Sequence, residues 1–147
     1  MTPTTYITNS GLVTAVGIGT TAACAAMRAG IDGFAEIPYY DYCRSTVPVI
    51  GAPVPPIPWK RSAAARQCAL LDAAVGEIAE QFDPATRANL AMIVTTCESE
   101  RNVVDERRAQ SLTETAVAAL GQGPAPVSVQ ALRGGAPASF RALALAR

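Results

Sequence analysis

Residues 6–33 read YITNSGLVTAVGIGTTAACAAMRAGIDG and carry the most informative pattern in the chain. Residues 6–10 are rich in β-prone side chains, and residues 12–16 continue in the same style. Gly11 separates the two runs, at a point where a bulge or a close backbone approach is expected. The first half of this stretch therefore predicts extended backbone, interrupted by a glycine.

The second half of the stretch predicts a helix. Thr20 or Thr21 can cap its start, and the helix is expected to run to about Ala29. Gly30 then stands where helices commonly end in a left-handed residue, and a bend over residues 30–33 follows.

This strand, glycine and helix resemble the opening of the β-ketoacyl synthases of the thiolase superfamily. Those proteins begin with an I-T-x-x-G-x-V-T strand, a glycine, a helix and then A-G-x-x-G. The matching positions are Ile7, Thr8, Gly11, Val13, Thr14, Gly17, Ala29, Gly30 and Gly33. The resemblance implies the amino-terminal half of such a synthase, and the order of the remaining elements agrees with it.

Residues 34–59 carry six prolines, which exclude a helix and predict a surface loop with one short strand near residues 47–51. The next segment has apolar residues at spacings of four and three, which predict one buried stripe on a long helix. The stripe comprises Ala64, Cys68, Leu71, Val75, Ile78 and Phe82. Arg66, Asp72, Glu77 and Glu80 lie off it, and Asp83-Pro84 is expected to end the helix.

Two further strands are expected at residues 90–95 and 127–132, the first of them buried on both faces. Between them, Ser111 and Glu114 have the spacing of a capping box, which predicts a helix from there to Leu120. The charged stretch 98–108 is expected to be a loop leading into a helix, and residues 138–147 a final helix.

Alternating strands and helices predict an α/β fold with a largely parallel sheet in one domain over residues 1–147. The resemblance implies more: a thiolase-like half, with a mixed, mostly parallel sheet flanked by helices. It also implies that this sheet is incomplete, because a full synthase chain is more than twice as long. An incomplete sheet leaves unpaired backbone and an uncovered apolar face, which calls for another copy, a second polypeptide or a loss of order in the last segment. The chain is therefore expected to be an oligomer or a truncated piece of a longer protein.

In active synthases the turn before the last of these helices carries the nucleophilic cysteine. Aligning the A-L-x-x-A tail of that motif with residues 142–146 places Ala136 at the nucleophile's position, and no cysteine follows Cys97. A methyl group cannot attack a thioester. The family's two further catalytic residues are typically histidines, and the chain contains none. We therefore expect no condensation by this chain alone, and no catalytic residue in it.

Other chemistry has weaker support in the sequence. Cys97 precedes Glu98 and Glu100, which would raise rather than lower a thiol pKa, so a structural role is favoured. A cluster of Glu98, Glu100, Asp105 and Glu106 can be imagined as an acid–base or cation site, but interleaved arginines favour a solvated charged helix. Trp59 is either an exposed contact or, as we favour, a packing residue. The four widely spaced cysteines, without histidine, predict no metal site, and no cofactor is expected.

The balance of charged residues limits the kinds of partner to be expected. Twelve basic and twelve acidic residues cancel, so no basic field is present to attract nucleic acid or a membrane surface. No signal peptide and no membrane-length apolar run is evident, and a cytoplasmic location is expected.

Three functions remain open. The first is a non-catalytic synthase-like module that acts through protein contacts, as a partner subunit or a secretion-associated adaptor. The second is a fragment or subunit of a 3-oxoacyl-[acyl-carrier-protein] synthase whose catalytic residues come from another chain. The third is a binder of acyl chains or acyl carrier protein. The expected partner is a second copy or another thiolase-like chain.

Overall fold

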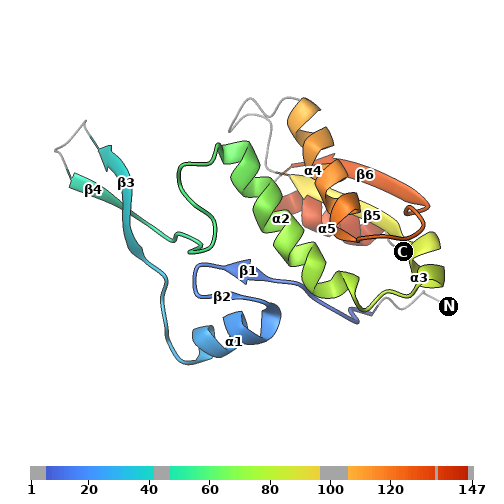
Figure 1. Cartoon of the computed structure of the whole chain (residues 1–147), viewed down its shortest axis with the longest axis horizontal. Coiled ribbons are helices and arrows are strands. Elements are labelled where there is room, and N and C mark those ends of the chain that lie inside the picture. Colours follow the sequence, from blue (N-terminus) through green and yellow to red (C-terminus); the bar gives the residue numbers. More distant parts are fainter. Residues whose placement is uncertain (1–5, 42–46, 97–105, 135, 146–147) are drawn as a thin grey trace.

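A computed structural model of the chain describes residues 6–41, 47–96, 106–134 and 136–145 (Figure 1). Its elements, in order, are β1 (Val13–Thr14), β2 (Gly17–Ile18), α1 (Thr20–Arg28), β3 (Ala35–Asp41), β4 (Val47–Gly51), α2 (Ala63–Ala79), α3 (Pro84–Ala88), β5 (Ala91–Thr96), α4 (Glu106–Ala119), β6 (Ser128–Arg133) and α5 (Ala136–Leu145). Helices and strands are mixed along the chain, which places it in the α/β class as predicted.

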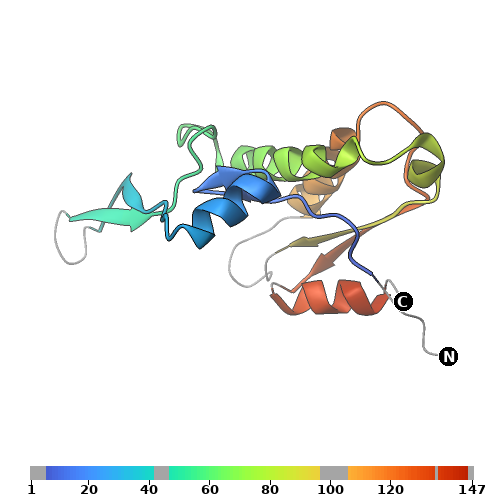
Figure 2. The ribbon, with the colours of Figure 1, turned by 90° about the horizontal axis from the view of Figure 1, so that it is seen from below.

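The part of the molecule that we call the body consists of α2, α4, β5, β6 and α5. Strands β5 and β6 run parallel and in continuous register, from Ala91 opposite Ser128 to Thr96 opposite Arg133. Helices α2 and α4 pack on each other on one side of this pair, whereas α5 lies on the other side (Figure 2). The body is therefore a small three-layer arrangement.

The core of the body lies between β5 and the two helices α2 and α4. Val94, Leu112 and Ala116 form its buried centre. Four partly buried side chains pack around them: Cys68, Leu71, Val75 and Met92. Three of these four belong to the apolar stripe predicted for α2, so the helix and its buried face are confirmed. Burying a leucine such as Leu112 contributes roughly 1.5–3 kcal/mol.

The expectation that β5 is buried on both faces is wrong. Val94 and Thr96, which face α2 and α4, are buried, whereas the alternate residues Ala91 and Thr95 are exposed. The reason is that α5 covers the second face only in part and leaves a hollow of about 430 Å³ against β5.

The region predicted as a proline-rich loop with one short strand contains a hairpin. The predicted strand is confirmed as β4, and β3 is the strand that was not expected. Strands β3 and β4 pair antiparallel, with a register irregularity between Ile37 and Tyr40. Pro38 lies within that irregularity, where its missing N–H interrupts no regular ladder, and this explains why proline did not prevent the strand. We call this hairpin the arm; it projects away from the body (Figure 1).

The amino-terminal segment is less regular than expected. Residues 6–12 form no strand, and Tyr6 and Ile7 are 79% and 83% exposed. A β-prone sequence forms a strand only where it pairs with another strand, and no described strand pairs with this segment. The helix α1 is confirmed, and Gly30 ends it with φ of 70° while its N–H donates to the carbonyl oxygen of Met27.

Two helix starts differ from the prediction. Helix α4 begins at Glu106, so Ser111 lies inside it and caps nothing. The hydroxyl of Thr115 donates to the carbonyl oxygen of Ser111, as is usual within a helix. Helix α5 begins at Ala136, two residues earlier than expected.

The sheet is also smaller than expected. The described strands form three separate two-stranded sheets, and only β5–β6 is parallel. The pairs β1–β2 and β3–β4 are antiparallel because short connections cannot supply the crossover that parallel strands need. No helix among the described residues is long and apolar enough to cross a membrane.

Candidate functional site

The turn between β6 and α5 is the place where the resemblance puts a nucleophile. Strand β6 ends at Arg133, and α5 begins with Ala136. Gly134 adopts a φ of 147°, and its N–H donates to the carbonyl oxygen of Thr96 at the end of β5 (3.4 Å). A strand, a tight glycine turn and a helix thus follow one another here. Because alanine carries only a methyl group, the first residue of this helix offers neither a nucleophile nor a proton.

The described cysteines behave as structural residues. Cys24 and Cys68 are free thiols. Cys68 packs against the core of the body, and its sulfur lies 3.6 Å from the hydroxyl oxygen of Ser111 on α4. Cys43 and Cys97 lie outside the described residues.

The imagined acidic cluster falls largely outside the described part of the chain. Glu98, Glu100 and Asp105 are not among the described residues, and Glu106 is exposed at the start of α4. Within the described ranges, no three His, Cys, Asp or Glu side chains gather closely enough to hold a metal ion. The sequence-based prediction that no metal is bound therefore stays a prediction.

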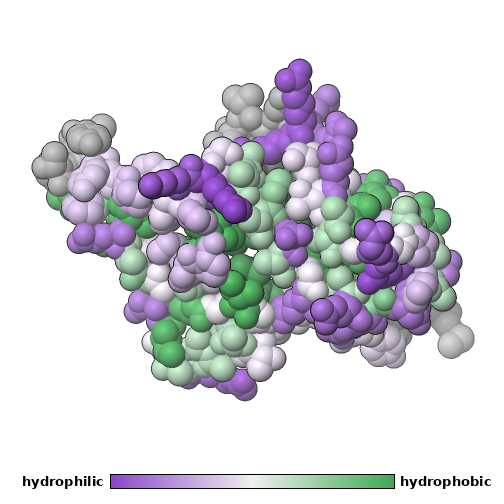
Figure 3. Space-filling model, viewed as in Figure 1, coloured by the Kyte–Doolittle hydropathy of each residue, from purple (hydrophilic) through white to green (hydrophobic). Residues whose placement is uncertain are grey.

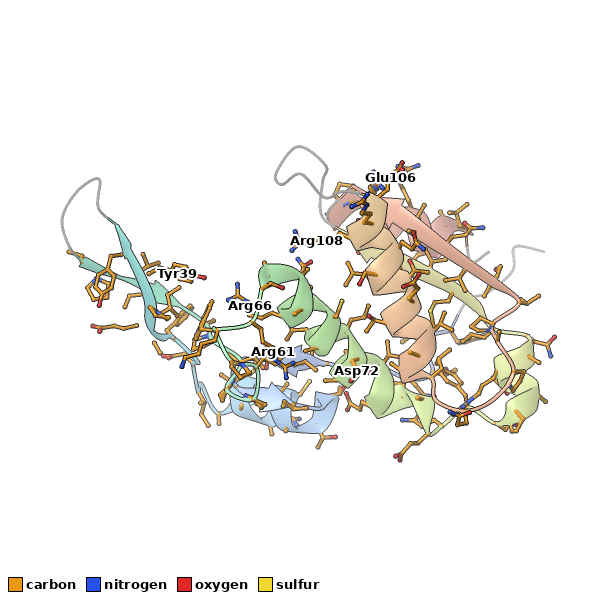
Figure 4. All side chains as sticks on the ribbon, turned by 45° about the horizontal axis from the view of Figure 1, so that its top comes forward. Tyr39, Arg61, Arg66, Asp72, Glu106 and Arg108 are labelled. Carbon is orange, nitrogen blue, oxygen red and sulfur yellow. The ribbon has the colours of Figure 1, made fainter. Side chains whose placement is uncertain are left out.

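Trp59 packs against strand β3 of the arm. The Trp59 ring packs edge to face against the ring of Tyr39, with 5.7 Å between the two ring centroids. The guanidinium carbon of Arg66 lies 4.6 Å from the centroid of the Trp59 ring. Figure 4 shows Tyr39 on the arm and Arg66 near the start of α2. The packing interpretation of Trp59 is confirmed.

Glu77 is a structural residue that sequence reasoning missed. Its carboxylate accepts the backbone N–H of Thr20 (2.5 Å) and of Leu12 (2.8 Å), two segments distant in sequence. These two bonds, Thr20 first, lower the pKa of Glu77 below its ordinary value. The residue before α1 is Gly19, which has no side chain to cap the helix. The prediction that Thr20 or Thr21 caps this helix is therefore wrong, since Thr20 is already its first residue. The free N–H groups of a helix start need an acceptor, and Glu77 supplies it.

Gly11 completes this junction between α2 and the amino-terminal segment. A Cβ atom at residue 11 would overlap the carbonyl oxygen of Ala74 on α2. The close approach that the sequence suggested at this glycine is therefore present. It holds the segment against α2, one turn from Glu77.

Two apolar grooves lie along the edge of β5 that faces away from β6. The first, of about 430 Å³, is bounded by Leu12, Leu71 and Leu112, among others. The second, of about 390 Å³, continues past Val75, Ile78 and Phe82 on α2. Thr96 lines the first groove, and its buried hydroxyl oxygen has no hydrogen-bond partner among the described residues. The grooves leave room for apolar groups beside the unpaired edge of β5.

Large apolar side chains are also exposed away from the grooves. Helix α5 exposes Phe140 (74%), Leu143 (51%) and Leu145 (61%). On and beside the arm the exposed residues are Phe34, Tyr39, Tyr40, Val47, Val49 and Ile50. In Figure 3 the arm is mostly pale, whereas deep purple, hydrophilic side chains project from the start of α4. Helix α5 and the arm are thus the places where several large apolar side chains are exposed close together in sequence.

Comparison of the chain with protein-family models, with curated proteins and with solved structures finds no significant match.

Proposed function

We propose that the chain is a non-catalytic, β-ketoacyl synthase-like module that acts through protein contacts. It is a partner subunit or a secretion-associated adaptor with a partial thiolase-like fold. The observation that carries the proposal is the β6–α5 connection, in which a glycine turn leads into a helix whose first residue is Ala136. A helix start is where the resemblance expects the nucleophile, because backbone N–H groups favour a thiolate there, and the sequence has alanine at that position.

The exposed apolar surface supports the protein-contact part of the proposal. Helix α5 exposes Phe140 and Leu143 on the outer side of the body, where a second layer of helices would cover them. The body sheet has two described strands, so β5 and β6 each have one edge free for another strand. Contacts with another protein at these places would remove apolar area from water. Each Å² of apolar surface so buried contributes about 25 cal/mol of binding free energy.

Thiol reactivity tests whether the start of α5 keeps the properties of a nucleophile turn. In a chain whose four cysteines are replaced by serine, Ala136→Cys is compared with Ser139→Cys, which lies one turn later on the same helix. Because a helix start favours the thiolate, the cysteine at 136 should alkylate severalfold faster at neutral pH. Equal rates would mean that the turn has no such character.

Thioester turnover tests the absence of catalysis. The unmodified chain should not decarboxylate or condense malonyl and acyl thioesters above the uncatalysed rate. Turnover that disappears on replacing any one of its cysteines would refute the non-catalytic assignment. The Ser139→Cys variant serves as the control for non-specific thiol reactions in the same assay.

The apolar groove beside β5 favours a second candidate, the binding of an acyl chain. A volume of about 430 Å³ lined by Leu12, Leu71 and Leu112 suits a medium-length alkyl chain. Titration with a fluorescent ten-carbon fatty acid tests it. Saturable binding at one site per chain supports this candidate, and linear, non-saturable uptake counts against it.

A further inference from the structure

The free edge of β5 is bordered by a segment of the same chain. Strand β6 pairs with one edge of β5, and no described strand pairs with the other. The groove of about 430 Å³ along this free edge is lined by Thr95 and Thr96 of β5 and also by Gly11 and Leu12. An unpaired strand edge is a template for a further strand. The amino-terminal segment therefore reaches the place where such a strand would add.

This segment is anchored at one end only. Gly11 approaches α2 so closely that a Cβ atom there would overlap the carbonyl oxygen of Ala74. The N–H of Leu12 donates to the carboxylate of Glu77, also on α2 (2.8 Å). Residues 6–9, which precede this anchor, are exposed to solvent and belong to no strand. The groove is thus continuous with an existing contact, and the chain beside it is free to move.

The backbone of the segment has one edge occupied and one edge open. In extended chain, successive residues point their N–H and C=O groups to alternate edges. The carbonyl oxygen of Leu12 accepts the N–H of Gly19, before α1, and that of Ser10 accepts the hydroxyl of Thr20 (2.8 Å). The backbone groups of the alternate residues make no hydrogen bond among the described residues: Ile7, Asn9 and Gly11. The edge that these three present is the one opposite α1, and it is open to pair with β5.

The side chains of the segment also match the grooves. Because side chains alternate between faces and the missing side chain of Gly11 would point at α2, Ile7 faces α2 as well. Four residues of strand span roughly 13 Å, which corresponds to about nine residues of helix. The segment runs toward the carboxyl end of α2 (Figure 1), so Ile7 would lie near Phe82. Ile78 and Phe82 line the second groove, which can take this side chain, now 83% exposed.

We infer that residues 7–11, which we call the strap, dock on the free edge of β5 as an additional parallel strand. The direction is parallel because Gly11 lines the groove at the carboxyl end of β5, and Ile7 reaches the groove that extends back to Leu90. The docked strap closes both grooves, so an apolar ligand or a partner's strand reaches β5 only after the strap is displaced. This inference goes beyond the proposed function, because both surfaces belong to one chain and no partner is required.

Disulfide formation tests the docking in the chain whose four cysteines are replaced by serine. With Gly11 beside Thr96, Thr8 comes beside Ile93, and both point away from α2. Thr8→Cys/Ile93→Cys should therefore form an intramolecular disulfide on mild oxidation. The matched control is Thr8→Cys/Gln130→Cys, because Gln130 pairs with Ile93 on β6, one strand further from the free edge. The control should oxidise severalfold more slowly, and equal rates would overturn the inference.

A further substitution distinguishes a docked strap from chance collisions of a free tail. Adding Ile7→Lys to the Thr8→Cys/Ile93→Cys chain should slow the disulfide severalfold, because a charged group is costly to bury in the second groove. Ile31→Lys, at a residue that is 58% exposed and outside the strap, should leave the rate unchanged. An unchanged rate with Ile7→Lys would overturn the inference.

The product of oxidation identifies the occupant of the edge. A covalent dimer in place of the intramolecular disulfide would also overturn the inference, because the edge would then hold the segment of a second copy. Far-UV circular dichroism checks that each variant is folded, and the comparison of Ile93 with Gln130 stands even if Ile7→Lys is not.

Discussion

The body and the arm have similarly apolar sequences but different surroundings. In the body, apolar residues of α2 recur at helical spacing, and they meet β5 and α4 so that Val94, Leu112 and Ala116 are buried. In the arm, Val47, Val49 and Ile50 are consecutive or nearly so, and therefore point to both faces of a thin hairpin. The difference shows that apolar content produces a core only where a second layer covers it.

The junction between α2 and the amino-terminal segment is a third kind of contact. It is held by the hydrogen bonds that Glu77 accepts from Leu12 and Thr20 and by the close approach at Gly11, with few large buried side chains. Its stability should therefore depend on charge, unlike that of the body.

The largest effect of a substitution on the free energy of unfolding is expected in the core of the body. Leu112→Ala removes a side chain that is 9% exposed and should lower the free energy of unfolding by about 2–5 kcal/mol, since a cavity remains. Val47→Ala on the arm is the matched comparison and should change it by no more than about 0.5 kcal/mol at concentrations where the chain is monomeric. Urea denaturation followed by far-UV circular dichroism measures both. Similar losses of unfolding free energy in the two variants would show that arm and body do not differ in packing.

A pH-dependent effect of intermediate size is expected at the junction. The folded-state pKa of Glu77 lies below its ordinary value of 4.5, so its contribution to stability is complete above that value and is lost as pH falls through the lowered pKa. Glu77→Gln should therefore melt at a lower temperature than wild type at neutral pH, and the difference should shrink as the pH falls below 4.5.

Melting curves at several pH values measure this difference. Asp83, whose pKa is also lowered, by the backbone N–H of Thr86, is present in both proteins and cancels in the comparison. A difference that stays constant with pH would show that the charge of Glu77 does not act through these bonds.

The smallest effect concerns the order in which the arm and the body unfold. Trp59 is the single tryptophan and packs against Tyr39 of the arm, so its fluorescence reports on that region. Because the arm is marginal by itself, the fluorescence transition of the monomer should occur at a lower urea concentration than the circular dichroism transition of the helices. Coincident transitions would mean that arm and body unfold as one unit.

Local patterns predicted the helices of the body well. The stripe from Cys68 to Val75 located α2 and its buried face, and the glycine after α1 located the end of that helix. The capping-box prediction at Ser111 failed because a pair of side chains at the right spacing says nothing about residues upstream, where α4 begins. The prolines of residues 34–59 misled in a similar way, since a single irregularity at Pro38 was enough to admit a strand.

The candidate site also has one feature that the sequence predicted and one that it did not. That the start of α5 carries no nucleophile is a matter of residue identity at Ala136, and so is the absence of histidine from the whole chain. The role of Glu77 was hidden, because its partners Leu12 and Thr20 are separated from it by 65 and 57 residues.

The sequence by itself determined the α/β class, the apolar face of α2 and the chemistry that the chain lacks, because these depend on residue type and on spacing within one element. Only the tertiary structure decided which strands pair, which carboxylate caps α1 and which apolar residues stay exposed on the arm. Those outcomes depend on contacts between distant segments, and such contacts form only when the backbone brings the segments together.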